Sequence, residues 1–162
     1  MKKSFYLLLI IGFISVAFTS IPNKQFSQNS KSDELKWEAN YEDAVKLAKK
    51  KKKPLLVFFT GSDWCGPCKM LHADLFENEE FIKLASKNLI LYKADFPRKI
   101  VLEKEVVAKN ESLRMKYQVP GYPTVILFNS KDEVIGKQIG YSRVQTTEAH
   151  LNMVKEAIEK YN

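Results

Sequence analysis

The chain has 162 residues, a formal net charge of +7, 45% hydrophobic residues and only two cysteines. At roughly 100–200 residues per domain, this length suits one compact domain and excludes a large multidomain enzyme. The hydrophobic fraction excludes a mostly disordered chain. Two cysteines can form neither a disulfide-rich scaffold nor a closed four-cysteine zinc site. We therefore expect a single small domain.

The first 20 residues have the layout of an export signal. Two lysines precede an apolar run from Phe5 to Phe18. A basic start followed by about 14 apolar residues is typical of a secretory signal peptide, and it falls short of the ~20 residues that comfortably span a bilayer. We predict a signal peptide over residues 1–20, with an uncleaved anchor or a buried helix as alternatives, and a flexible polar linker over 21–34. Loss of both lysines with the signal lowers the charge by two, from +7 to +5.

The remaining residues, 35–162, alternate between helical and strand patterns. Asn40 is a suitable N-cap for a first helix, which ends in a lysine run before Pro54. Continuous apolar runs such as LLVFF at 55–59 are typical of strands buried on both faces. In chain order we expect a helix over 41–53, a strand over 55–59, a helix from about 66 to beyond 75, a helix over 79–86, a strand over 88–94, a helix over 97–117 with Pro97 in its first turn, strands over 124–128 and 133–139 joined by a hairpin turn, and a helix from Thr146 or Thr147 to Tyr161. Strands wrapped by helices predict a three-layer α/β domain.

The chemistry of the chain is expected at Trp64-Cys65-Gly66-Pro67-Cys68. Two cysteines three residues apart at the start of a helix can reach disulfide geometry without backbone movement. Unpaired N–H groups and the dipole at a helix N-terminus favour the Cys65 thiolate, because cysteines at such positions have pKa values of roughly 3.5–7.5. Cys68 lies one turn deeper and can attack a mixed disulfide formed by Cys65, which releases the partner. Two side chains therefore suffice for a complete two-step exchange.

Other uses of the two cysteines stay open. Tetrahedral zinc needs four ligands, and only His72 and His150 could add ring nitrogens, so a soft-metal site of Cys65, Cys68 and His72 is one alternative. A structural disulfide is another, although a four-residue loop restrains the unfolded chain little. We assign no metal and no cofactor beyond the redox-active Cys65–Cys68 disulfide itself.

The WCGPC motif after a buried strand, together with VPGYPT at 119–124 before the next strand, resembles the thioredoxin superfamily. The resemblance covers essentially all of residues 35–162 in element order. It is closest to exported bacterial thioredoxin-like proteins related to the thiol–disulfide interchange proteins, as the Lys53-Pro54, Asp95-Phe96-Pro97 and Gly140-Tyr141 segments also indicate. It implies a three-layer thioredoxin fold, a central mixed β-sheet with helices on both faces.

The resemblance also implies a role for each residue of these motifs. Cys65 would attack and Cys68 would resolve. Pro123 would be the cis-proline that faces the disulfide, with Pro120 as its competitor, since X–Pro bonds are cis at modest cost. The substrate-binding residues would be Trp64, Gly66, Pro67, Tyr122 and Pro123, with an ordinary, partly buried tryptophan as the alternative for Trp64.

Two departures from the family pattern stand out. The buried aspartate that the family places beneath its cysteines should fall at Phe58, where no carboxylate exists. Burial near a phenylalanine should raise the pKa of the Cys68 thiol. In the family a lysine usually accompanies that aspartate, and Lys93 is the candidate for its position. The alternative is that Lys93 is an ordinary lysine at the solvated end of a strand. The segment between Asp95 and Pro123 is also longer than a minimal thioredoxin needs, and we expect it to lengthen the helix over 97–117.

The predicted function is an exported protein thiol–disulfide oxidoreductase that works mainly as a reductant. The Gly-Pro pair between the cysteines resembles reducing members of the superfamily, whereas oxidising members usually carry a histidine before the second cysteine. The alternatives are a disulfide oxidase or isomerase, or a redox-inert binding or metallochaperone module.

The expected partners follow from this function. They are cysteine-containing exported proteins and a membrane electron donor. We expect the protein itself to be a monomer that is periplasmic or otherwise exported, or that stays tethered to the membrane by an uncleaved signal. The lysine run over 49–53 could suggest anionic lipid or nucleic acid. No aromatic residues interleave with the lysines, so a solvated helix end is the better interpretation. We expect no nucleic-acid partner.

Overall fold

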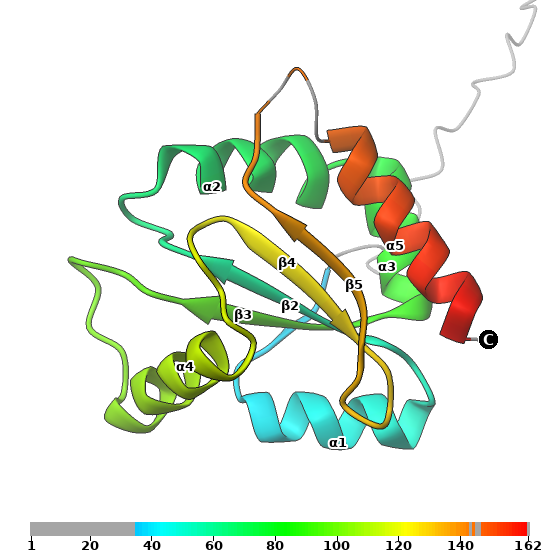
Figure 1. Cartoon of the computed structure of the whole chain (residues 1–162), viewed down its shortest axis with the longest axis horizontal. Helices are drawn as coiled ribbons and strands as arrows, with labels where there is room; N and C mark the ends of the chain where they lie inside the picture. The colour runs from blue at the N-terminus through cyan, green and yellow to red at the C-terminus, as the bar shows by residue number, and fades with distance from the viewer. Residues whose placement is uncertain (1–34, 143, 145–146, 162) are drawn as a thin grey trace, which may run out of the picture.

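The computed structural model describes residues 35–142, 144 and 147–161 (Figure 1). The predicted signal peptide over 1–20, the linker over 21–34 and the candidate cap Thr146 lie outside the described residues. The elements are, in chain order, β1 (Trp37–Glu38), α1 (Tyr41–Lys51), β2 (Leu55–Thr60), α2 (Gly66–Leu71), a π-helical turn (His72–Phe76), α3 (Glu79–Asn88), β3 (Ile90–Asp95), α4 (Lys104–Lys116), β4 (Thr124–Phe128), β5 (Val134–Ile139) and α5 (Thr147–Tyr161).

The five strands form one mixed sheet in the order β1-β3-β2-β4-β5. β1 and β2 both pair with β3 in parallel, whereas β4 runs antiparallel to β2 and β5 antiparallel to β4. Every residue of β2 and β4 is buried, as the continuous apolar runs predict for central strands. The register sets Phe58 of β2 beside Lys93 of β3 and opposite Val125 of β4.

Helices cover both faces of the sheet (Figure 1). On one face α2, α3 and α5 pack against alternate residues of the central strands, including Leu56 and Phe58 of β2. On the other face α1 and α4 pack against the intervening residues, Leu55, Val57 and Phe59. Because successive side chains of a strand point to opposite faces of the sheet, β2 contributes to two separate hydrophobic cores. The three-layer α/β prediction, with a central mixed sheet, is confirmed.

The first helix follows its predicted signals closely. The Asn40 side chain accepts a hydrogen bond from the Asp43 N–H at 3.2 Å and so caps α1. The helix ends two residues earlier than predicted, because Lys52 takes a left-handed conformation with φ of 52° and its N–H bonds back to the last turn. None of the helices in the described part of the chain is long and apolar enough to cross a membrane.

The prediction of one helix over 97–117 is wrong at its start. α4 begins at Lys104, and residues 97–103 form a loop instead, so Pro97 is in no helical turn. The physical reason is a long-range interaction: the Asp63 carboxylate binds the backbone N–H groups of Arg98, Lys99 and Ile100. Smaller differences include the short strand β1, which was not predicted, the start of β3 at Ile90 rather than 88, the end of α3 at Asn88 rather than 86, and the π-helical turn that continues α2.

Candidate active site

Cys65 and Cys68 form a disulfide at the start of α2, with Cα atoms 5.3 Å apart. Cys65 is the N-cap of this helix, and its Sγ accepts a hydrogen bond from the Cys68 N–H at 3.3 Å. The Cys65 N–H in turn donates to the Gly61 carbonyl at 2.8 Å, which fixes the turn that leads from β2 into the helix. A Cys65 thiolate would keep the Cys68 N–H as a donor and would lie at the positive end of the helix, which favours the charged nucleophile.

Tyr122 and Pro123 lie at the same edge of the sheet as the cysteines. β4 starts at Thr124, which pairs with Phe59 near the end of β2, and β2 leads directly into the cysteine turn. Among the described residues the cis peptide bond is Tyr122–Pro123, as the sequence resemblance implies, and not the bond before Pro120. The Thr124 hydroxyl donates to the Gly121 carbonyl at 2.8 Å and closes this turn.

Trp64 forms part of an aromatic rim beside the disulfide. Its ring is 6.0 Å from that of Tyr122 in an edge-to-face arrangement, and Tyr122 stacks on Phe96 at 5.0 Å. The indole N–H of Trp64 donates to the Phe96 carbonyl at 2.8 Å, and the residue is 37% exposed. Gly66 and Pro67 are exposed on the adjoining helix start. All five predicted substrate-binding residues therefore lie in the two turns at this end of the sheet or in the first residues of α2, and their contact with substrate stays a prediction.

Gly61 is a site residue that the sequence analysis missed. A Cβ at this position would lie 2.4 Å from Cε2 of the Trp64 ring, so only a glycine lets the indole lie against the turn. The signal in the sequence was present, since a glycine directly after a buried strand often marks a close approach of another group. Gly61 therefore allows the Trp64 indole to pack against the turn that precedes Cys65.

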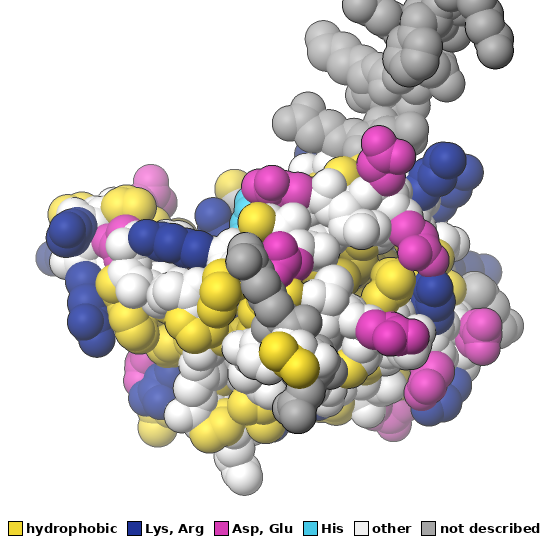
Figure 2. All heavy atoms as spheres, turned by 90° about the horizontal axis from the view of Figure 1, so that it is seen from above, with side chains coloured by type: hydrophobic (Ala, Val, Ile, Leu, Met, Phe, Trp, Pro, Cys, Tyr) yellow, Lys and Arg dark blue, Asp and Glu magenta, His cyan; other side chains and the backbone are white. Residues whose placement is uncertain are grey.

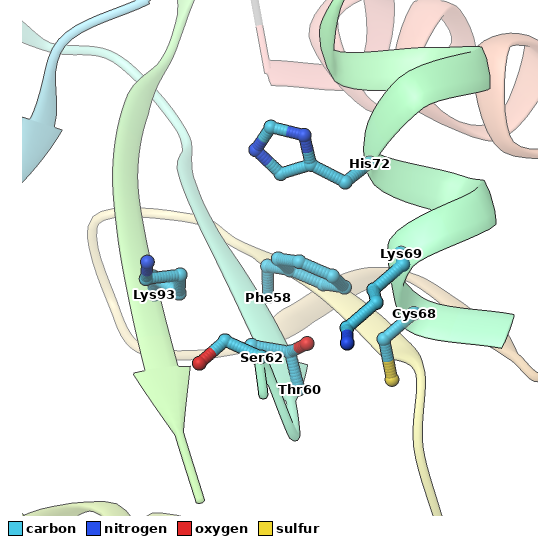
Figure 3. Close-up of a pocket in the computed structure, with 7 residues that line it drawn as sticks. All are labelled: Phe58, Thr60, Ser62, Cys68, Lys69, His72 and Lys93. Carbon is cyan, nitrogen blue, oxygen red and sulfur yellow. The ribbon is translucent and has the colours of Figure 1, made fainter. Parts of the chain in front are cut away.

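A pocket of about 290 Å³ opens beneath Cys68 (Figure 3). Phe58 forms its floor, and no carboxylate is among the residues of the described chain that line it, which are Phe58, Thr60, Ser62, Cys68, Lys69, His72 and Lys93. Phe58 is 1% exposed, and its ring packs 4.8 Å from that of Phe76. The structure thus puts Phe58 where the sequence analysis placed it. Lys93, which is exposed, lines the pocket from the neighbouring strand.

Asp63 is the second residue that the sequence analysis missed. Its carboxylate accepts the N–H groups of Arg98 at 3.0 Å, Lys99 at 2.6 Å and Ile100 at 3.2 Å. Desolvation raises the pKa of Asp63, but the hydrogen bonds from these three N–H groups outweigh it and hold the pKa below its usual value of 3.8. Asp95, at the end of β3, also holds the turn before the cysteines. Its carboxylate accepts the Ser62 N–H at 2.9 Å and the Ser62 hydroxyl at 2.6 Å.

The two histidines of the alternative metal site lie on different elements, His72 in the π-helical turn and His150 on α5. The His72 ring pairs through Nδ1 with Glu77 Oε1 at 3.1 Å on the exposed side of the helix, and His150 is buried on α5. Within the described residues no group of three or more His, Cys, Asp or Glu side chains could hold a metal ion. Both cysteine sulfurs are joined in the disulfide.

Comparison with known proteins identifies the family of the chain. The family profile for a thioredoxin-like domain matches residues 41–155. The disulfide bond reductase DsbH of Chlamydia pneumoniae is 32% identical over 127 residues, which cover 77% of this chain and 74% of DsbH. The thioredoxin-related protein DsbJ of Chlamydia pneumoniae is 28% identical over 116 residues, or 72% of this chain, and the chain spans only about a third of its length, 33%.

Solved structures give the same result. A DsbH oxidoreductase superposes with a TM-score of 0.70 at 27% identity, covering 84% of this chain and 94% of that structure. A thioredoxin from Thermus thermophilus, at 18% identity, shares the fold with a TM-score of 0.62, covering 80% of this chain and 91% of that structure. With a family match over most of its length and a cysteine pair at the start of α2, the chain belongs to the thioredoxin-like family and is a thiol–disulfide oxidoreductase.

Proposed function

We propose that this protein is exported and reduces disulfides in other exported proteins. The observation that carries the proposal is the Cys65–Cys68 disulfide at the helix start, where the Cys65 sulfur accepts the Cys68 N–H, flanked by the Trp64 and Tyr122 rim. This arrangement supplies a nucleophile, a resolving group and a surface on which a substrate can rest. The export part of the proposal is supported by the basic and apolar composition of residues 1–20.

The reaction needs no group beyond the two cysteines. In the reduced protein the Cys65 thiolate attacks one sulfur of a substrate disulfide; the substrate S–S bond breaks and one substrate thiolate leaves. The Cys68 thiolate then attacks Cys65 Sγ, which breaks the mixed disulfide, forms the Cys65–Cys68 bond and releases the second substrate thiolate. Two electrons pass from the cysteine pair to the substrate, and a dithiol donor in the membrane would restore them by the same exchange.

The reducing direction is supported by the two residues between the cysteines. Gly66 and Pro67 offer no charged or hydrogen-bonding side chain that would stabilise a reduced thiolate strongly and make the pair oxidising. The relative DsbH, 32% identical to this chain, carries the name disulfide bond reductase. Compartments outside the cytoplasm favour disulfides. A reductase that works there would therefore need a membrane donor to keep its cysteine pair reduced.

The direction is tested by equilibrating the folded domain with glutathione mixtures and measuring the reduced fraction of the Cys65–Cys68 pair. We expect a potential at or below roughly −200 mV, in the range of glutaredoxins and thioredoxin. A value above about −150 mV would rule out the reductase proposal. A parallel assay follows insulin reduction, with Cys65→Ser as the inactive control; equal turnover by wild type and this variant would show a redox-inert binding module instead.

The substrates are identified by trapping. In a Cys68→Ser variant the mixed disulfide on Cys65 cannot be resolved, so partners stay attached and can be identified by mass spectrometry. The Cys65→Ser variant keeps the same surface without the nucleophile and is the matched control. Partners recovered with the first variant and absent from the second would be exported proteins with paired cysteines.

A further inference from the structure

The loop between β3 and α4 is held beside the cysteine turn by backbone interactions. Asp63, two residues before Cys65, accepts the N–H groups of Arg98, Lys99 and Ile100 with both of its carboxylate oxygens. Because the donors are backbone groups, the side chains of these residues are not needed for the attachment. The loop is therefore fixed in place without using the side chains of Lys99 and Ile100, which are exposed.

A second set of contacts fixes the root of this loop to the aromatic rim. The Phe96 N–H donates to the Thr60 carbonyl and the Phe96 carbonyl accepts the Trp64 indole N–H, both at 2.8 Å. The Arg98 guanidinium lies over the Trp64 ring, 3.9 Å from its centroid, at cation–π distance. Residues 98–101, here called the docking arm, thus extend from the same rim that flanks the disulfide.

The docking arm presents two apolar and two basic side chains to solvent. Ile100 is 54% exposed and Val101 is 93% exposed, while Arg98 and Lys99 are also exposed. Hydrophobic and basic side chains gather at the corresponding end of the molecule in Figure 2. The oxygens of the Asp63 carboxylate beside the arm are occupied by backbone N–H groups, and its single negative charge is outnumbered by the charges of Arg98 and Lys99. Single exposed apolar residues are ordinary, but adjacent ones beside two cations on a fixed loop form a defined surface.

We propose that the docking arm binds the substrate protein next to the disulfide being reduced, at an extended acidic segment that carries an apolar side chain. This rests on the proposed function. The charge of the arm selects the acidic residues and the Ile100–Val101 tip takes the apolar one. The Ile100 N–H donates to Asp63, which lies two residues before Cys65. The substrate residues that the arm recognises would therefore lie within roughly four residues of extended chain from the substrate cysteine that Cys65 attacks.

The test uses two disulfide-bonded peptides of equal length and the small compound hydroxyethyl disulfide. One peptide carries glutamates and a leucine three to five residues from its cysteine, and the other carries lysines and a serine there. The reduced protein is mixed with each substrate by stopped flow, and the second-order rate constant for its oxidation is measured. We expect the acidic peptide to react at least five-fold faster than the basic one, with the ratio falling in 0.5 M salt because exposed charges are screened.

Variants separate the docking arm from general surface effects. Lys99→Gln combined with Val101→Ser should lower the acidic-to-basic ratio at least three-fold. Lys51→Gln combined with Val134→Ser changes the same residue types at exposed positions on α1 and β5, and should leave the ratio unchanged. Equal reduction of both peptides, or an unchanged ratio in the arm variant, would overturn the docking inference alone. No reduction of any of the three disulfides would overturn the proposed function and the inference with it.

Discussion

Phe58 of β2 lies beside Lys93 of β3 in the parallel register, and both side chains line the pocket that reaches Cys68 (Figure 3). An apolar ring thus occupies the floor of the pocket, and a cation from the next strand lies on its wall. Lys69 lines the same pocket, and cations in it favour the Cys68 thiolate, which is the form that attacks a mixed disulfide. We therefore expect Lys93 to support the resolving step that Cys68 performs.

Lys93→Met should slow the decay of the Cys65 mixed disulfide roughly 2- to 10-fold at pH 7, the effect of one unit charge across a partly solvated pocket. The difference should shrink as the pH rises toward 10, because Cys68 then ionises without help. Quenched-flow mass spectrometry with a disulfide peptide measures the decay. Lys87→Met removes an exposed lysine on α3 and serves as the control. Equal decay rates for wild type and Lys93→Met at pH 7 would contradict this role.

Gly61→Ala should displace the Trp64 indole, because the added Cβ would lie 2.4 Å from the ring. The displacement breaks the hydrogen bond to the Phe96 carbonyl, and overpacking of this kind costs about 1–3 kcal/mol of the free energy of unfolding. Urea denaturation measures the loss. Tryptophan fluorescence in a Trp37→Phe background, which leaves Trp64 as the single reporter, should shift to the red.

Gly121→Ala is the matched control for this prediction, since a Cβ there meets nothing within 4 Å. It should leave the emission maximum in place. An unshifted spectrum for Gly61→Ala would mean that the turn, and not the indole, gives way.

Asp63→Ala should release the docking arm without unfolding the domain. Backbone amide exchange at Arg98, Lys99 and Ile100 should accelerate, because these N–H groups lose their acceptor. Asp63→Asn keeps one acceptor oxygen and removes the charge, so an intermediate protection is expected. Exchange rates measured by NMR that are the same in all three proteins would rule out the anchoring role of the carboxylate.

The same carboxylate gives the arm a predictable pH dependence. The pKa of Asp63 is held below 3.8, since the backbone N–H groups outweigh the desolvation that raises it. A lowered pKa means that the stabilisation is complete above the ordinary value and is lost as the pH falls through the lowered one. The Lys99 amide chemical shift should therefore titrate with a midpoint below 3.8. A midpoint above that value would show that the carboxylate is not stabilised by these bonds.

Asn110→Ala should destabilise the fold by about 1–3 kcal/mol, because it leaves a buried hydroxyl without its acceptor. Asn110 is 1% exposed; its Oδ1 accepts the Tyr92 hydroxyl at 2.6 Å, and its Nδ2 donates to the Asp95 carbonyl at 3.0 Å. Burial of Tyr92 raises its pKa to about 12, so the hydroxyl stays a donor well above neutral pH. A double-mutant cycle with Tyr92→Phe should give a coupling of at least about 0.5 kcal/mol. Additive effects would contradict the link between α4 and β3.

The sequence predicted those parts of the fold that depend on local patterns. The runs at 55–59 and 124–128 became β2 and β4 because uninterrupted apolar residues are stable only between two covered faces. The cysteine pair and the turn before β4 were found because short motifs carry their own chemistry. Asn40 was recognised as a cap because the interaction spans three residues.

Features that depend on contacts far apart in the sequence were missed. The start of α4 was misplaced because Asp63 binds N–H groups 35 to 37 residues away, and no local pattern reports such a bond. β1 has two residues, too few for a periodic signal, and it exists through its pairing with β3. Asn110 looks like any polar residue of an exposed helix until Tyr92 is placed beneath it.

The bonds between Asp63 and the docking arm are made to backbone amides alone, and every amino acid except proline carries that amide. Substitutions at 98, 99 and 100 can therefore change charge, size or polarity without moving the loop away from the cysteines. Changes at these three positions would therefore alter which substrates a related protein binds, while the exchange reaction itself stays the same. The fold in this way separates the part that can vary from the part that performs the exchange.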